Sequence, residues 1–195
     1  MHKRMIAWVM LPAALSLLYG CAGPAARGVH DIRVTIEALH ETEPGRMKLM
    51  EPGTDIEKAA IERFKDFYKV FSAERINASI GEVYSGDAYF EDGIRQVRGL
   101  NEIKAYFLGT TGAFESCTFD IRDVAVSRGD YYFRWVMDLK LKRDPDNPLI
   151  LPGMSHVRFD EQGKIVFHQD YWETLQLFER FPLIGTVIRW IKARI

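Results

Sequence analysis

The sequence predicts an α+β domain in which helices cover one face of a curved antiparallel sheet. Three observations indicate this class. A segment with helical periodicity, residues 54–72, precedes a region of two-residue alternation, residues 116–173. Strands and helices do not alternate in the βαβ pattern that builds parallel sheets. The chain of 195 residues has the length of one domain with appendages.

The composition is that of an ordinary globular protein, with 47% hydrophobic and 27% charged residues. The formal net charge of −1 gives no positive field, so we expect no nucleic-acid partner. The sequence has no glycine-rich phosphate loop, no GxSxG and no HExxH. We therefore expect no cofactor and no metal.

The first twenty residues have the pattern of a signal peptide. A basic start is followed by an apolar run from Met5 to Leu18, which is short for a membrane span. The run ends Leu18-Tyr19-Gly20-Cys21, which resembles a bacterial lipobox, although Tyr19 is bulkier than usual there. This pattern predicts a lipidated Cys21 and a protein of the bacterial cell envelope, facing the periplasm, on the outer rather than the inner membrane. The alternatives are an ordinary cleaved signal or an uncleaved anchor.

Residues 21–53 are interrupted by glycine and proline and are expected to form a tether, with a short strand or helix near Ile32–Leu39. A capping box, Thr54 and Glu57, then starts a helix that runs to about Ser72. Tyr68 falls on the apolar stripe of this helix, where core packing is its commonest role.

Shorter elements follow this helix. Phe90 and Asp92 share one face of a predicted strand. The expected elements are a helix at 78–84, a turn at 85–87, a strand at 88–92, a hairpin through Gly93 into 96–97, and a helix at 101–108.

Two long strands are predicted at 116–126 and 131–142, followed by a polar loop at 143–148. Trp135 lies on the continuous apolar face of the second strand. Cys117, on the first, has no neighbouring histidine in the sequence and is expected to be a core residue.

The segment 153–173 reads as a hairpin with a tight turn at 160–163. Ser155, Val157 and Phe159 share one face of its first strand. On the second strand, one face carries Val166, His168, Asp170 and Trp172, and the other carries Ile165, Phe167, Gln169 and Tyr171. An imidazole, a carboxylate and an indole in one row suggest a pocket. The alternative is a surface His–Asp pair with Trp172 packed at the strand end.

The tail, residues 174–195, is expected to be a helix broken at Phe181-Pro182. Its second half combines a wide apolar face with Trp190 and several cations, the ingredients of an interfacial membrane helix. The alternative, which we expect from sequence, is a helix docked on the domain or on a second subunit.

Two motifs carry a family resemblance over residues 54–173. They are Asp87-Ala88-x-x-Glu91-Asp92 and the run from Ser155 to Phe159 with Gly163-Lys164-Ile165-Val166. Both are similar to ketosteroid isomerase segments, and the chain resembles the nuclear transport factor 2-like superfamily, which also includes SnoaL-type cyclases and limonene epoxide hydrolases. The resemblance implies a cone, a curved sheet wrapped around helices, with a pocket at its open end.

The resemblance to ketosteroid isomerases also implies roles. Asp92 takes the place of the general base, Tyr68 that of the oxyanion-hole tyrosine, and Ser155 that of an aspartic acid donor. Because a serine hydroxyl is the weaker donor, and because His168 and Asp170 make the pocket polar, steroid isomerisation is not expected. The pocket wall would include Phe90, Trp135 and Trp172.

The chemistry expected of this set is proton transfer next to a carbonyl. Asp92 or Asp170 would be the base, Tyr68 would donate to the enolate oxygen, and His168 would position Asp170 or shuttle the proton. The other classes are a non-catalytic module that binds a small apolar ligand, and a structural envelope lipoprotein that forms a homodimer.

Overall fold

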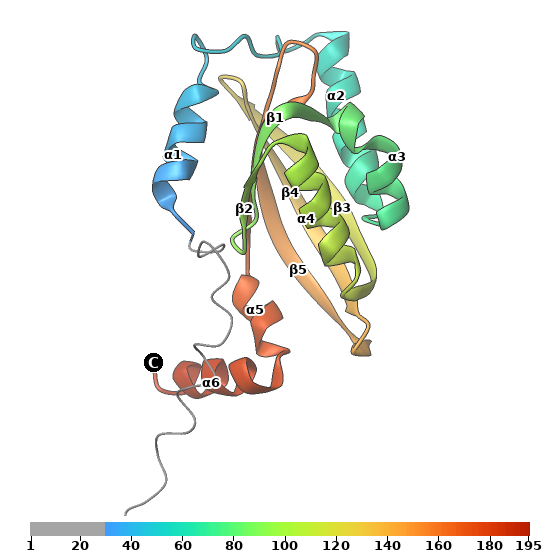
Figure 1. Ribbon diagram of the computed structural model, residues 1–195, viewed down its shortest axis with the longest axis vertical. Helices are drawn as coiled ribbons and strands as arrows, with labels where there is room; N and C mark the ends of the chain where they lie inside the picture. The colour runs from blue at the N-terminus through green and yellow to red at the C-terminus, as the bar shows by residue number, and fades with distance from the viewer. Residues whose placement is uncertain (1–29) are drawn as a thin grey trace, which may run out of the picture.

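The structure, a computed structural model, describes residues 30–195, so the predicted signal peptide and Cys21 lie outside the described residues. Within these described residues, twelve helices and strands follow one another (Figure 1). They are α1 (Ile32–Glu41), α2 (Asp55–Lys69), α3 (Ala73–Val83), β1 (Tyr84–Glu91), β2 (Gln96–Arg98), α4 (Leu100–Thr111), β3 (Phe114–Ser127), β4 (Asp130–Leu141), β5 (Asp144–Phe159), β6 (Ile165–Trp172), α5 (Thr174–Glu179) and α6 (Pro182–Lys192).

One curved sheet of six strands, in the order β2-β1-β6-β5-β4-β3, organises the domain (Figure 1). The α+β class and the curved sheet are confirmed. Neighbouring strands are antiparallel except β1 and β6, which pair in parallel. This pair differs from the expected antiparallel sheet because the last strand returns to the middle of the sheet, between β1 and β5.

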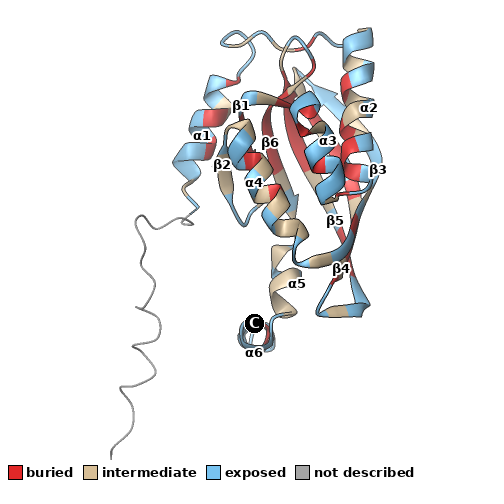
Figure 2. Cartoon of the chain, turned by 45° about the vertical axis from the view of Figure 1, so that its right-hand side comes forward, coloured by how far each residue is buried: buried red, intermediate tan, exposed pale blue. Residues whose placement is uncertain are grey.

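Helices cover the sheet on both faces (Figure 2). The larger core lies under α2, α3 and α4, where Phe64 and Phe67 pack with Phe133 and Phe159. On the other face Ala38 of α1 packs with Tyr89 and Phe167. Burial of these aromatic side chains is the main force that holds the helices to the sheet.

The predicted capping box begins α2. The Thr54 hydroxyl accepts a hydrogen bond from the Glu57 backbone N–H at 3.2 Å. The Glu57 carboxylate accepts from the Gly53 backbone N–H at 2.6 Å, one residue earlier than in the ideal box. Both bonds satisfy N–H groups that a helix start leaves free.

Residues 30–53, part of the predicted tether, pack on the domain. The short element expected near Ile32–Leu39 is helix α1, capped by Asp31. The Arg158 guanidinium donates to the Leu39 carbonyl at 2.6 Å and to the Thr42 hydroxyl at 3.1 Å. Met50 is buried in the core. Residues 30–53 of the predicted tether therefore lie against the domain.

Two predicted loops lie in strands. Residues 85–87 belong to β1, whose pairing with β6 shifts register between Tyr84 and Tyr89. Residues 144–148 belong to β5, although they include Pro145 and Pro148. Prolines are tolerated there because β6 joins β5 only from Gly153 onward, which leaves one side of that stretch unpaired.

A bulge breaks the predicted alternation of β6. The β5–β6 register shifts between Arg158 and Phe159. Ile165 therefore joins the larger core, whereas Val166 lines a small surface cavity beside α1, the reverse of the prediction. The expected common face of His168, Asp170 and Trp172 survives because the bulge precedes them.

The tail forms α5 and α6, and the predicted break at Phe181-Pro182 is confirmed. Within residues 30–195, no helix has the length and apolarity needed to cross a membrane.

Candidate functional site

A cavity of about 240 Å³ lies between the larger core and the tail. Most of its lining is apolar, and Asp92, Asp170, Tyr68 and Tyr106 are its principal polar groups. The other lining residues are Phe71, Phe90, Ile94, Phe107, Thr110, Ala113, Phe114, Cys117, Phe119, Trp135, Met137, Leu139, Leu141, Trp172, Leu177 and Phe181. Two carboxylates thus face one apolar space.

Asp92 is held rigidly just after β1, in the turn to β2. Its Oδ1 accepts hydrogen bonds from the backbone N–H groups of Ile94 and Arg95, both at 3.0 Å. Its Oδ2 accepts from the Tyr106 hydroxyl at 2.5 Å. Burial raises the pKa of Asp92 above its usual range, and the charge of Asp170 adds to this, while the three hydrogen bonds oppose it. Asp92 is therefore a stronger base than a surface aspartate.

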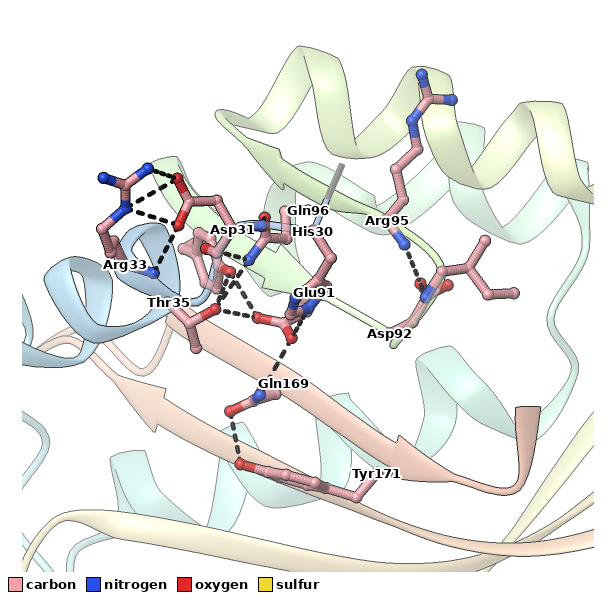
Figure 3. A network of polar contacts seen from close by, with 12 residues as sticks. His30, Asp31, Arg33, Thr35, Glu91, Asp92, Arg95, Gln96, Gln169 and Tyr171 are labelled. Atoms are coloured by element: carbon pink, nitrogen blue, oxygen red, sulfur yellow. Dashed lines mark hydrogen bonds and ion pairs between the residues drawn. The ribbon is translucent and has the colours of Figure 1, made fainter. Parts of the chain in front are cut away.

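Glu91, the residue before Asp92, points to the opposite face of the sheet (Figure 3). Its carboxylate accepts hydrogen bonds from the hydroxyls of Thr35 and Tyr89, both at 2.6 Å, and contacts His30. Burial alone would raise the pKa of Glu91, but these hydrogen bonds outweigh it and the pKa is lowered. Glu91 thus stays ionised and ties α1 to the sheet.

Asp170 sits at the centre of a second set of hydrogen bonds. Its Oδ1 accepts from the Ser155 hydroxyl at 2.5 Å and lies 2.8 Å from Nε2 of His168. The Trp135 indole donates to the Ser155 hydroxyl at 2.9 Å. Since an indole N–H can only donate, it leaves the Ser155 proton to Asp170.

Two tyrosines extend this set on the other side of His168. The Tyr84 hydroxyl lies 2.5 Å from Nδ1 of His168, and the Tyr68 hydroxyl lies 2.5 Å from that of Tyr84. Burial raises the pKa of Tyr68 and of Tyr84 well above the ordinary value, so both phenols stay protonated.

The Asp170 carboxylate, which can only accept, fixes which group donates in each hydrogen bond from His168 through Tyr84 to Tyr68. With the His168 proton on Nε2, facing the Asp170 carboxylate, Nδ1 accepts from Tyr84 and the Tyr84 oxygen accepts from Tyr68. Tyr68, which lines the cavity, is therefore the donor at the outer end of this chain.

The predicted site residues divide into two groups. Tyr68, Phe90, Asp92, Trp135, Asp170 and Trp172 line the cavity. Ser155 and His168 do not line it; they are buried behind Asp170 and hydrogen-bonded to it. The expectation that Ser155 contacts a ligand therefore differs from the structure, since its hydroxyl is engaged by Trp135 and Asp170.

Neither indole fills the cavity. Trp135 packs edge-on against Phe119 at 5.1 Å, and Trp172 donates to the Asp92 backbone carbonyl at 2.7 Å. The Trp172 bond joins the end of β6 to the end of β1, and so holds the two carboxylate-bearing segments together.

Tyr84 and Tyr106 are the polar residues that sequence reasoning missed. Tyr84 was placed at the end of a helix, but two-residue alternation from Phe90 back to Tyr84 would have put it on the core face. Tyr106 gave no signal, because only the folded chain brings α4 to Asp92.

Cys117 lines the cavity but is buried. Burial, with the nearby charge of Asp138, raises the pKa of its thiol to about 12. The thiol stays protonated near neutral pH, which fits a core residue and not a nucleophile.

Comparisons with known proteins establish the family. A family model described as a SnoaL-like domain matches residues 64–168, more than half of the chain. The chain belongs to the SnoaL-like family. No curated protein matches this SnoaL-like chain.

Solved structures share the fold of this SnoaL-like chain. A protein with a ketosteroid isomerase-like fold from Catenulispora acidiphila, in complex with trimethylamine, is 15% identical with a TM-score of 0.53, covering 61% of this chain and 88% of that one. A nuclear transport factor 2-like protein of unknown function from Burkholderia pseudomallei is 11% identical with a TM-score of 0.55, covering 63% and 97%. Another such protein, from Exiguobacterium sp. 255-15, is 15% identical with a TM-score of 0.51, covering 58% and 98%. At these identities the likeness establishes the fold alone.

Proposed function

We propose that this domain binds a small, largely apolar molecule that carries a carbonyl group and transfers a proton next to that carbonyl. The observation that carries the proposal is the pair of carboxylates, Asp92 and Asp170, in one apolar cavity of about 240 Å³. Burial makes Asp92 a stronger base than an ordinary surface aspartate, as proton abstraction from carbon requires.

Each polar group has a part in the proposed reaction. The Asp92 carboxylate takes the proton from the carbon next to the carbonyl, with Asp170 as the alternative base. Negative charge then develops on the carbonyl oxygen. Tyr68 donates to that oxygen when its hydroxyl turns from Tyr84 to the cavity, while Tyr84 still donates to Nδ1 of His168. Asp170 accepts from Nε2 of His168 and so keeps Nδ1 an acceptor for Tyr84, and Ser155 fixes Asp170.

Exchange of carbon-bound protons tests this function without knowledge of the natural substrate. The probe is 2-tetralone in D₂O, an enolisable bicyclic ketone, and the readout is the loss of its α-proton signals by NMR. We expect the protein to accelerate exchange, Asp92→Asn to abolish the acceleration, and Tyr68→Phe to reduce it by roughly 10²–10³.

The matched control is Asp123→Asn, at an exposed aspartate paired with Arg134 on the sheet. This variant should accelerate exchange of the ketone's α-protons as much as the wild type does. If no ketone that binds exchanged its α-protons faster, or if the exchange rates with wild type and Asp92→Asn were equal, the domain would be a binding module and not an enzyme.

A small tertiary ammonium ion is a second candidate ligand. The related fold from Catenulispora acidiphila was solved in complex with trimethylamine. Here aromatic side chains and two carboxylates surround the cavity, a combination that suits a methylated cation. Titration with trimethylamine, followed by chemical shifts of the Asp92 and Asp170 amides, would separate this candidate from the ketone. The non-catalytic alternative is a binding or dimeric module of the envelope. It predicts that a ligand changes the amide chemical shifts but that exchange of the ketone's α-protons is not accelerated.

We further propose that the domain, residues 54–173 with 174–195 as its tail, is held at the bacterial envelope by lipidation of Cys21. The lipobox-like end of the apolar run at residues 5–18 supports this. Residues 22–29 lie between Cys21 and the described part of the chain, whose residues 30–53 pack on the domain. Incorporation of an alkyne-bearing fatty acid in growing bacteria, present in wild type and lost in Cys21→Ser, is the expected result; equal labelling would contradict it.

A further inference from the structure

Helix α6 presents an apolar surface that nothing within residues 30–195 covers. Leu183 is 85% exposed, Val187 57% and Trp190 56%. Spaced four and three residues apart, these side chains form one stripe along the helix. Ile184 and Ile191 widen the same stripe.

The opposite, polar side of α6 is the one attached to the protein. Gly185 is buried against α5, where a Cβ would lie 2.0 Å from the Glu179 carbonyl oxygen. Arg189 donates to that carbonyl at 3.0 Å, and Lys192 pairs with the Glu179 carboxylate at 2.5 Å. A helix of a globular domain normally buries its apolar side. Here the arrangement is inverted, so the apolar stripe is held outward.

The charges around the stripe are positive. Residues 180–195 include Arg180, Arg189, Lys192 and Arg194 and contain no Asp or Glu. Arg180 pairs with Asp144 and Lys192 with Glu179, whereas Arg189 and Arg194 have no ion-pair partner within residues 30–195. The Arg194 guanidinium lies over the Trp190 ring at 3.8 Å, and that of Arg143 lies over the Phe181 ring at 3.9 Å. Tryptophan, arginine and a wide apolar face are what an interface between anionic headgroups and acyl chains favours.

We infer that α6 lies in the headgroup region of an anionic membrane, with its apolar stripe among the acyl chains. A second copy of the chain fits less well as the occupant. An α6 of eleven residues is about 16 Å long, and one such stripe falls well short of the roughly 800 Å² per partner of a stable interface. The helix also lies at one end of the molecule, clear of the sheet (Figures 1 and 2).

This placement brings the cavity to the membrane surface. Leu177 of α5 and Phe181, at the α5–α6 junction, line the cavity. A membrane-bound α6 would therefore seat one wall of the cavity on the headgroups. The inference stands on α6 alone and does not depend on proton transfer in the cavity.

Depth-dependent quenching of Trp190 tests the inference in the full chain. The protein is reconstituted into vesicles of phosphatidylethanolamine and phosphatidylglycerol that carry brominated acyl chains, which quench nearby indoles. The Trp190 signal is the difference between the wild type and Trp190→Phe, because the other tryptophans contribute equally to both. With Cys21 lipidated as proposed, the anchor would bring the domain to the vesicle in every variant, so the readout is the quenching of Trp190 and not vesicle binding.

We expect the Trp190 emission to shift to shorter wavelength and to be quenched, more strongly than in phosphatidylcholine vesicles. Val187→Asp should lose most of the quenching. The matched control is Ile36→Asp, at an apolar residue of α1 that is 58% exposed, and it should quench like the wild type. Because both positions are equally exposed, neither substitution threatens the fold.

Two results would overturn the inference. One is Trp190 emission that bromine does not quench while the protein is on the vesicle. The other is a particle of twice the chain mass in light scattering that Val187→Asp converts to a monomer, with no quenching in either form, which would assign the stripe to a second copy.

Discussion

Glu91 and Asp92 are neighbours in the chain, yet their carboxyl groups meet opposite surroundings (Figure 3). Asp92 faces an apolar cavity, and burial raises its pKa. For Glu91, hydrogen bonds from Thr35, Tyr89 and His30 outweigh burial and lower the pKa. Period-two alternation at the end of a strand is enough to separate the two roles.

The two carboxylates should change stability with pH in opposite senses. Glu91, with a pKa below its ordinary 4.5, stabilises the fold above that pH and loses this contribution as the pH falls through its folded pKa. Asp92, with a pKa above its ordinary 3.8, destabilises the fold as the pH rises from 3.8 through its folded pKa. Relative to wild type, Glu91→Gln should therefore become less stable, and Asp92→Asn more stable, as the pH rises from 3 to 7.

Urea unfolding at a series of pH values measures both differences. Asn can keep the bonds from Ile94 and Arg95 at Oδ1, and its Nδ2 can donate to the Tyr106 oxygen in place of the bond that Tyr106 donates to Asp92, so Asp92→Asn mainly removes the charge. If the free energy of unfolding of each variant differed from that of the wild type by the same amount at every pH, neither pKa would be shifted.

For single residues, the sequence predicts only which side chains share a face of a helix or strand. It predicts Asp92, Asp170 and Tyr68 near one pocket, because alternation and helical spacing are local. It does not predict that Tyr84 lies between Tyr68 and His168, or that Ser155 serves Asp170, because those bonds depend on packing between distant segments.

Among the elements, the β4–β5 pair shapes the cavity through one glycine. Gly153 lies directly opposite Trp135 in the sheet, and a Cβ on Gly153 would come within 2.1 Å of the indole. The indole therefore lies over the backbone of Gly153, and from there it lines the cavity and donates to Ser155.

Gly153→Ala should displace Trp135. We expect a loss of about 1–3 kcal/mol in the free energy of unfolding, as overpacked cores show. The indole, pushed towards the cavity, should also weaken binding of the ketone probe. Chemical denaturation and the NMR titration measure the two effects.

Gly109→Ala is the matched control, since a Cβ at Gly109 of α4 meets nothing within 4 Å. It should leave ligand binding unchanged and stabilise the helix slightly. Equal behaviour of the two variants would contradict the role given to Gly153.

Elements with strong local signals were the predictable ones: the cap of α2, the apolar face of β4 and the break before α6. The bulge in β6, the proline-containing start of β5 and the docking of α1 were not predictable. Each depends on which strand or face lies alongside, and a single strand's sequence does not contain that information.

For the whole molecule, residues 30–53 act as part of the fold. Without them Glu91 would lose Thr35 and His30, and Tyr89 and Phe167 would be uncovered on the outer face of the sheet. A chain that begins at residue 54 should therefore be several kcal/mol less stable, since each fully buried aromatic side chain contributes about 1.5–3 kcal/mol.

The comparison is with a chain that begins at residue 30, which keeps α1. Thermal unfolding and light scattering of both should show a lower transition temperature and association only for the shorter chain. Equal stability of the two chains would mean that α1 contacts the sheet but does not stabilise the fold.

The N-terminal end of α1 points towards the side of the molecule where α5 and α6 lie, and the β5–β6 turn is at the opposite pole (Figure 1). If Cys21 carries lipid, eight residues lie between it and His30, a reach of about 30 Å at most. With α6 as a second point of attachment, the domain could no longer rotate freely relative to the membrane. Every copy would show the same pole to the aqueous compartment, and whatever enters the cavity beside α5 would arrive by lateral diffusion in the plane of the bilayer.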